Sequence, residues 1–145
     1  RSPPGTAARP SFWKGPEMDL SDLAQVNFDA LPYWEAAAKG DLVVARCTSC
    51  NEAHHYPRAV CPFCKAETIA FEPASGTGEI YSLAVTRIPD KPLRVVAYVT
   101  LAEGPTMMTR IIDAPEDVAI GDPVRVDFEP HPEGLTVPVF RLDRN

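Results

Sequence analysis

The sequence has no apolar run of the roughly 18 to 20 residues that a membrane-spanning helix requires. It also shows no charged segment followed by an apolar stretch near its start, which is the pattern of a secretion signal. We therefore expect a soluble protein.

Positive charge is scarce as well, because 14 Lys and Arg stand against 20 Asp and Glu, and the net charge is -6. Since contacts to nucleic-acid phosphates need clustered positive charge, this balance disfavours nucleic acid as a partner.

Long helices and familiar catalytic motifs are missing too. The 145 residues include 16 prolines and 8 glycines, and such residues divide a chain into short strands and turns. The length suffices for one modest core with a small appendage. No GxSxG, P-loop, GxGxxG or HExxH motif occurs, and we predict no catalytic residue in this chain.

The four cysteines form two CxxC pairs, Cys47 with Cys50 and Cys61 with Cys64, separated by ten residues. Four thiolates at about 2.3 Å complete the tetrahedral shell of zinc and leave no position for water. We therefore predict that these cysteines bind one structural zinc ion. Paired thiolates without a secretion signal also favour a reducing compartment, with the cytoplasm as the default location. A disulfide pair, a redox CxxC and an iron site are the alternatives.

The cysteines lie in a segment that we predict to be a zinc ribbon over residues 41–73. A β-branched stretch at 42–46 runs directly into Cys47, so a strand delivers the first ligand. A ribbon of this size buries too little apolar surface to fold alone, but zinc binding can supply on the order of 10 kcal/mol. His54 and His55 lie between the two pairs. Because four thiolates already complete the shell, we expect a surface or supporting role for both.

The segment before the ribbon, residues 1–40, is predicted to be an N-terminal arm with a short helix. Proline, glycine and charge dominate residues 1–25, where Phe12 and Trp13 would pack either on a partner chain or on the protein's own core. Pro32 suits a first helical position and Gly40 suits the residue after a last turn. These signals predict a helix over 32–39.

The segment after the ribbon, residues 74–145, is rich in β-branched residues and turn signals. A stretch at 114–122 has Pro and acids early and Gly late, which suits a helical turn. Five strands with a helical connection after the third are the layout of an OB-fold barrel, although other small barrels share this order. The fold class is therefore mainly β. The predicted strands cover residues 78–87, 94–102, 106–112, 124–129 and 136–142.

A resemblance to a known family covers residues 31–142. It is carried, in this order, by YWEAAAKGDLVVARCTSC, YPRAVCPFC, ASGTGEIYSLAVT, PEDVAIGDPVRVDFE and VPVFRL. In combination these motifs resemble the DUF35 family, which implies a rubredoxin-like zinc ribbon followed by an OB-fold described as acyl-CoA-associated. The resemblance further implies a noncatalytic accessory subunit, because such proteins typically accompany a thiolase-fold enzyme. That partner is a thiolase, an acyltransferase or an aldolase acting on acyl-CoA.

The implied role predicts a groove between ribbon and barrel where the long, thin arm of a CoA thioester lies as a shared ligand. Because CoA carries phosphate charges, we expect cationic side chains beside this groove. The candidates for these contacts are Arg46, Arg58, Lys65, Arg87, Lys91, Arg94 and Arg110. At the tip of the second cysteine pair, Val60, Pro62 and Phe63 are candidates either for a docking surface or for core.

The state of assembly and the alternatives follow from the same patterns. Thiolase-fold enzymes are usually dimers, so symmetry favours a heterotetramer of two partner subunits and two copies of this chain.

The alternative function is a single-stranded nucleic-acid-binding module, since ribbons and OB-folds both bind single strands. The acidic balance of the chain argues against this alternative. A stand-alone enzyme of CoA metabolism would need a nucleophile or base that the motifs do not supply.

Overall fold

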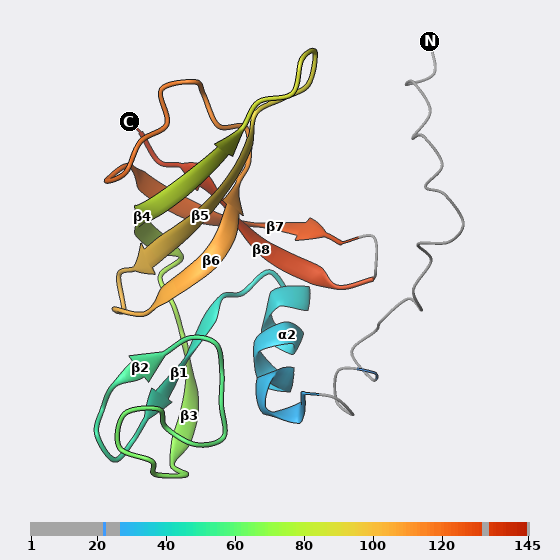
Figure 1. Cartoon of the computed structure of the whole chain (residues 1–145). Coiled ribbons are helices and arrows are strands. Elements are labelled where there is room, and N and C mark those ends of the chain that lie inside the picture. Colours follow the sequence, from blue (N-terminus) through green and yellow to red (C-terminus); the bar gives the residue numbers. More distant parts are fainter. Residues whose placement is uncertain (1–21, 23–26, 132–133, 145) are drawn as a thin grey trace.

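The computed structural model describes residues 22, 27–131 and 134–144 of the chain. A short helix leads into a three-stranded ribbon, and a closed five-stranded barrel follows (Figure 1). This order confirms the predicted mainly β fold. The predicted arm over 1–25, with Phe12 and Trp13, lies outside the described residues apart from residue 22. Within the described part of the chain, no helix is both long and apolar enough to cross a membrane.

The helical segment starts with the 3-10 turn η2, Phe28–Ala30, and continues as α2, Leu31–Ala38. Pro32 lies in the first turn of α2, where its missing N–H costs no helical hydrogen bond. Gly40 follows the helix at φ 82°, a conformation that glycine adopts without strain. The predicted helix over 32–39 is thus confirmed with a shift of one residue.

The ribbon is an antiparallel sheet in which β1, Val43–Cys47, lies between β2, Ala53–His54, and β3, Ile69–Pro73. Ala45 at the centre of β1 is paired with a residue on each neighbour. The strand expected at 42–46 is confirmed, and its last residue is the first cysteine. Strand β3 was not predicted, although it forms the longer of the two pairings of β1.

The barrel closes in the order β4-β5-β6-β8-β7, with β7 pairing back to β4. All pairs are antiparallel except β6 with β8. This is the predicted OB-type arrangement of five strands, and all five predicted strands are present within a few residues of their expected bounds. Their bounds are Thr77–Thr86 for β4, Arg94–Leu101 for β5, Thr106–Ile111 for β6, Pro123–Pro130 for β7 and Thr136–Leu142 for β8.

The helical connection predicted over 114–122 is wrong. This segment contains two separate turns, closed by the N–H of Val118 on the carbonyl of Pro115 and by the N–H of Asp122 on the carbonyl of Ala119. The carboxylate of Asp122 also accepts the N–H of Ala119 at 2.9 Å. A helix needs successive bonds between residues four apart. Proline, acids and glycine serve β-turns equally well, so the composition did not distinguish the two.

One hydrophobic core joins the ribbon side to the barrel. The apolar residues that come from the helix and β1 are buried in the same cluster as those inside the barrel, and α2 packs against β8. Because burial of shared apolar surface fixes two modules relative to each other, the ribbon and the barrel form a single body. The central members are Tyr33, Leu42, Val44, Ile80, Val99 and Phe140.

Replacing the aromatic ring at the centre of this core tests the shared packing. Phe140→Ala should lower the free energy of unfolding by about 3 to 5 kcal/mol, because it removes a buried ring and leaves a cavity; Phe140 is 0% exposed. Urea unfolding of the zinc-loaded protein, followed by circular dichroism, measures the change. The matched control Phe28→Ala removes a ring that is 71% exposed and should change stability by less than about 0.5 kcal/mol. Equal effects of the two substitutions would contradict this core.

Candidate metal centre and adjoining groove

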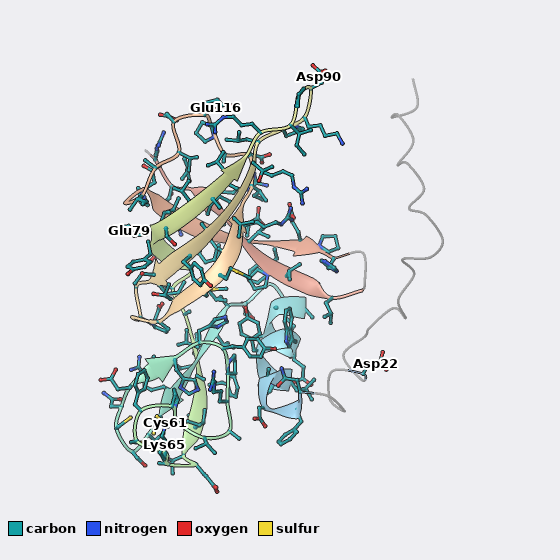
Figure 2. The ribbon with its side chains drawn as sticks, in the orientation of Figure 1. Asp22, Cys61, Lys65, Glu79, Asp90 and Glu116 are labelled. Carbon is teal, nitrogen blue, oxygen red and sulfur yellow. The ribbon has the colours of Figure 1, made fainter. Side chains whose placement is uncertain are left out.

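The two CxxC segments fold into matching turns. The N–H of Asn51 donates to the carbonyl of Cys47 at 2.8 Å, and the N–H of Lys65 donates to the carbonyl of Cys61 at 3.0 Å. Asn51 and Lys65 each follow the second cysteine of their pair, and both adopt left-handed backbone conformations, with φ of 62° and 65°. The same turn, built twice, directs both sulfurs of each pair toward one point. The tip of the second turn is labelled by Cys61 and Lys65 in Figure 2.

The four sulfur atoms have the spacing of a tetrahedral metal shell. They lie within 4.8 Å of one another, with Cys47 and Cys64 at 3.6 Å and Cys50 and Cys61 at 3.7 Å. Ligands at about 2.3 Å from zinc would be about 3.8 Å apart at the corners of a tetrahedron. A disulfide would bring two sulfurs to about 2.05 Å, so the disulfide alternative does not fit. The cysteines fit one structural zinc ion as predicted.

Backbone N–H groups around the sulfurs favour thiolates at two of the four positions. The pKa of Cys47 is lowered to about 6, chiefly by the N–H of Cys50. Burial raises the pKa of Cys61, but the N–H groups of Cys64 and Phe63 outweigh it and the net shift is downward. At Cys50 the N–H of Glu52 lowers the pKa, yet burial and the neighbouring thiols raise it to about 12. The metal-free cluster therefore holds both thiols and thiolates.

Zinc affinity should fall as the pH falls, because a thiol must lose its proton before it ligates the metal. With a pKa of about 12, Cys50 is protonated at pH 8 in the metal-free chain. Binding then releases at least one proton, so the dissociation constant should rise about tenfold for each pH unit lost. Below pH 6 Cys47 also takes up a proton, and the slope should steepen. Competition with a chromophoric chelator from pH 8 to pH 5 measures this, and a constant affinity would contradict the four-thiolate site.

An aromatic cluster holds the segment between the two cysteine pairs against the helix. The indole N–H of Trp34 donates to the hydroxyl of Tyr56 at 2.6 Å, and the amide of Asn27 donates to the same oxygen at 3.2 Å. The ring of Tyr33 lies 5.4 Å from that of His55 and 5.8 Å from that of Tyr56. These contacts fasten the loop to the helix.

The pKa values of the two ribbon histidines are both lowered, and His54 is buried while His55 is half-buried. His54 is only 4% exposed, and neither of its ring nitrogens has a hydrogen-bond partner among the described residues. Burial lowers its pKa, while the nearby backbone of Arg58 opposes part of the shift. Burial and then the charge of His54 lower the pKa of His55 to about 4. Neither belongs to the metal cluster. A surface role is wrong for His54, and a supporting role at the metal shell stays a prediction for both.

A groove of about 470 Å³ lies between the ribbon and the turn that joins β5 to β6. The ribbon wall includes His54, Arg58 and Phe63, and the barrel wall is the turn at 103–106. Figure 1 shows this turn at the edge of the barrel that faces the ribbon. The turn was predicted only as a connection, because its role as a wall depends on how the two modules dock. A groove between ribbon and barrel is therefore present where one was expected.

The candidate cations do not gather in one site. Only Arg46 and Arg58 line the groove. Arg46 is held by Glu72 and by the carbonyl of Asn51, whereas Arg58 makes no ion pair among the described residues. Of the seven candidates, Arg46 and Arg58 thus lie beside the groove, and their contact with a CoA phosphate stays a prediction.

The other candidates lie elsewhere on the surface. The ammonium of Lys65 donates to the carbonyl of Pro62 within its own turn, and Arg87 pairs with Glu116. Three more line a separate hollow on the barrel, namely Lys91, Arg94 and Arg110. None of these three residues lines the groove between ribbon and barrel, so none would contact a ligand held in that groove alone.

The tip of the second cysteine pair exposes apolar side chains, as expected of a docking surface and not of a core. Val60 is 42% exposed and Phe63 is 61% exposed, while Pro62 and Phe63 line the groove. These residues are therefore not core. Whether they dock a partner stays a prediction.

The fold and the metal centre together define a class, a four-cysteine zinc ribbon joined to an OB-type barrel. Family models match both parts, the rubredoxin-like zinc ribbon domain of ChsH2 over residues 34–70 and the C-terminal OB-fold domain of ChsH2 over residues 71–129. A DUF35 domain-containing scaffold protein from Methanothermobacter thermautotrophicus is 33% identical over 98 residues, which cover 61% of this chain and 71% of that protein. The chain belongs to the DUF35 family, as its motifs indicated.

Two further comparisons extend this assignment. The chain is 39% identical over 122 residues to a probable enoyl-CoA hydratase alpha subunit from Thermomonospora curvata; this match covers 80% of the chain but only 38% of that longer protein. In a solved structure titled Ltp2-ChsH2(DUF35) aldolase, a chain with 39% identity matches with a TM-score of 0.70, over 81% of this chain and 97% of that one. A DUF35 protein of unknown function from Sulfolobus solfataricus shares the fold at 10% identity and a TM-score of 0.62, over 84% of this chain and 92% of its own.

Proposed function

We propose that this chain is a noncatalytic accessory subunit of an acyl-CoA enzyme. In this proposal it supports assembly and activity of the complex and helps to hold the acyl-CoA substrate. The partner is a thiolase-fold subunit, either a thiolase, an acyltransferase or an aldolase. The observation that carries the proposal is the groove between the zinc ribbon and the barrel, in a chain whose relatives bear the names of parts of larger enzymes.

The names of the relatives support an accessory role. One title joins a DUF35 protein to an aldolase, and this chain spans nearly the whole of the matching chain in that structure. Another relative is named as an alpha subunit of a hydratase that acts on enoyl-CoA, and a third is named as a scaffold protein. Each of these names describes a component that works with others. Work as a component of a larger assembly is what these names have in common, and one of them adds acyl-CoA chemistry.

The chemistry of the groove suits a CoA thioester. Phe63 and Pro62 offer an apolar wall for the pantetheine arm, while the rest of the lining is largely polar and includes Glu52 and Glu103. Arg58 lines the same groove without an ion pair in the described part of the chain. A free guanidinium binds phosphate oxygens in a bidentate manner. Arg58 is accordingly our first choice for a phosphate contact, ahead of Arg46.

The proposed complex has a simple symmetry and a reducing environment. A thiolase-fold dimer with one copy of this chain on each subunit gives a heterotetramer. Zinc thiolates persist in reducing compartments, so the proposed location is the cytoplasm. The metal in this complex is structural, because four thiolates leave no position for a substrate.

Mixing this chain with the purified thiolase-fold subunit from the same host tests the assembly. Size-exclusion chromatography with light scattering should show one species with the mass of two copies of each protein, and both proteins alone provide the reference masses. Native mass spectrometry should find two zinc ions in that species. If the two proteins elute separately at concentrations well above those of the cell, the accessory role is wrong.

A charge in the groove can be removed without touching the metal or the core. In the assembled complex, Arg58→Ala should weaken acyl-CoA binding by about tenfold or more, since a hydrogen bond to a charged group contributes about 1.5 to 3 kcal/mol. Isothermal titration with acetyl-CoA measures the affinity. The control Arg87→Ala removes an arginine that pairs with Glu116 away from the groove and should leave affinity within about twofold. Equal affinities for both variants would remove the groove from the CoA site.

A further inference from the structure

The outer face of the barrel carries an exposed apolar strip that no other described residue covers. It consists of Tyr81 on β4, Val96 and Tyr98 on β5, and Met108 on β6, and we call these four residues the barrel strip. Their exposed fractions are 68%, 45%, 48% and 63%. They are four of the eight large apolar side chains exposed in the described part of the chain. Figure 1 shows β4, β5 and β6 side by side on one face of the barrel.

Strand register brings the strip together. Tyr98 is directly paired with Met108 on one side and with Ser82 on the other. Between Ile80 and Ser82 the register shifts, so that Tyr81 is an extra residue beside the pairing of β4 with β5. A bulge of this kind places two residues opposite one and redirects a side chain. Tyr81 is thereby added to the outer face next to Tyr98, while Ile80 stays buried.

Unpaired cations lie at one end of the strip. In β5, Arg94 is two residues before Val96 and faces the same side. Arg94 and Lys91 form no ion pair within the described ranges, whereas Arg110, opposite Val96, pairs with Glu129. Most other arginines in the described part of the chain are bound to carboxylates. This end of the strip therefore has two cations, Lys91 and Arg94, that form no ion pair with a described residue.

A hollow of about 320 Å³ lies at the same end. Its lining includes Val96 of the strip, the cations Lys91, Arg94 and Arg110, and the carboxylates of Asp113 and Glu129. Glu129 pairs with Arg110 and Asp113 pairs with Arg141, so Lys91 and Arg94 are the lining cations that no ion pair engages among the described residues. The hollow thus offers an apolar floor next to two unpaired cations. A carboxylate carried on a partner's apolar surface matches both features, because interfaces combine a buried apolar centre with complementary charge at the rim.

The strip also leads to the groove. Beyond Tyr98 and Met108 the next paired outward residues are Thr100 and Thr106, whose hydroxyls are 3.1 Å apart. Thr106 itself lines the groove between ribbon and barrel. A protein seated on the strip would consequently reach the edge of the groove and cover it from the barrel side.

We propose that the barrel strip and the hollow beside it are the contact surface for the partner enzyme subunit, with an acidic side chain of the partner in the hollow. This inference rests on the proposed function and adds the surface at which the two proteins meet. Only Tyr81 and Tyr98 of the strip offer rings for stacking bases, and the unpaired cations lie at one end only. The strip therefore fits a protein surface better than a single-stranded nucleic acid, which needs stacking platforms along a basic groove.

Two substitutions on the surface test the contact. Met108→Asp places a charge in the strip, and Arg94→Glu reverses the charge at the hollow. Each should raise the dissociation constant for the purified thiolase-fold subunit of the same host by about tenfold or more. Salt should weaken the wild-type complex, because it screens the attraction between Arg94 and the partner's acidic side chain. Arg94→Glu removes this attraction and should abolish that weakening. Isothermal titration at two salt concentrations measures both effects.

Matched controls separate the contact from general damage. Ile120→Asp charges another exposed apolar residue, 68% exposed, in the connection before β7, and Lys39→Glu reverses a cation after α2. Both should bind within about twofold of the wild-type chain. Zinc content and the thermal unfolding midpoint of all four variants should match those of the wild-type chain, because every substituted side chain is exposed.

Several results would overturn the inference. If the wild-type chain binds the enzyme subunit and the strip variants bind equally well, the surface is wrong while the proposed function stands. If the wild-type chain does not bind at all, the proposed function itself fails and the inference fails with it. Two further outcomes would assign the strip to another occupant, each in a case where Met108→Asp leaves enzyme binding unchanged. If this substitution abolishes binding of an oligothymidine probe, the strip binds nucleic acid. If it abolishes self-association in sedimentation, the strip binds a second copy of the chain.

Discussion

The bonds from four cysteine thiolates to one ion are the constraint on which the ribbon side of this protein depends. Strand β2 has only two residues, and the two cysteine turns consist largely of polar residues, proline and exposed apolar side chains. Zinc binding can contribute on the order of 10 kcal/mol to folding, more than such a segment could gain by burial. The same turns carry Pro62 and Phe63 into the groove wall. The groove wall therefore has its shape only when the cysteine turns are held by the metal.

A second constraint positions the ribbon on the barrel. The helix, β1 and the barrel strands share one core, and Trp34 and Tyr56 fasten the loop between the cysteine pairs to the helix. With the ribbon fixed on one side and a closed barrel on the other, the groove exists before any ligand arrives. A preformed site loses less conformational freedom on binding than one that must be ordered. The outer barrel face, by contrast, leaves an apolar strip open to solvent, which is the arrangement expected of a subunit that is completed by another protein.

The sequence permitted prediction of the metal ligands, because two CxxC pairs have few uses other than metal binding. Stretches rich in β-branched residues, separated by turn signals, likewise located the five barrel strands. Prediction failed where the outcome depends on tertiary contacts. Strand β3 is defined mainly by its pairing with β1, the segment at 114–122 was ambiguous between turn and helix, and the candidate cations were separated by the fold. The bulge that exposes Tyr81 has no signal in its own segment, since the neighbouring residues continue an ordinary strand pattern.

In the proposed complex the zinc-held ribbon supports activity although the zinc itself takes no part in the reaction. The most direct measurement is therefore the turnover of the proposed thiolase-fold partner with no addition, with the zinc-loaded chain, and with the chain from which a chelator has removed the metal. We expect that only the zinc-loaded chain raises turnover and that restoring zinc to the stripped chain restores the effect. Equal turnover in all three mixtures would contradict this expectation.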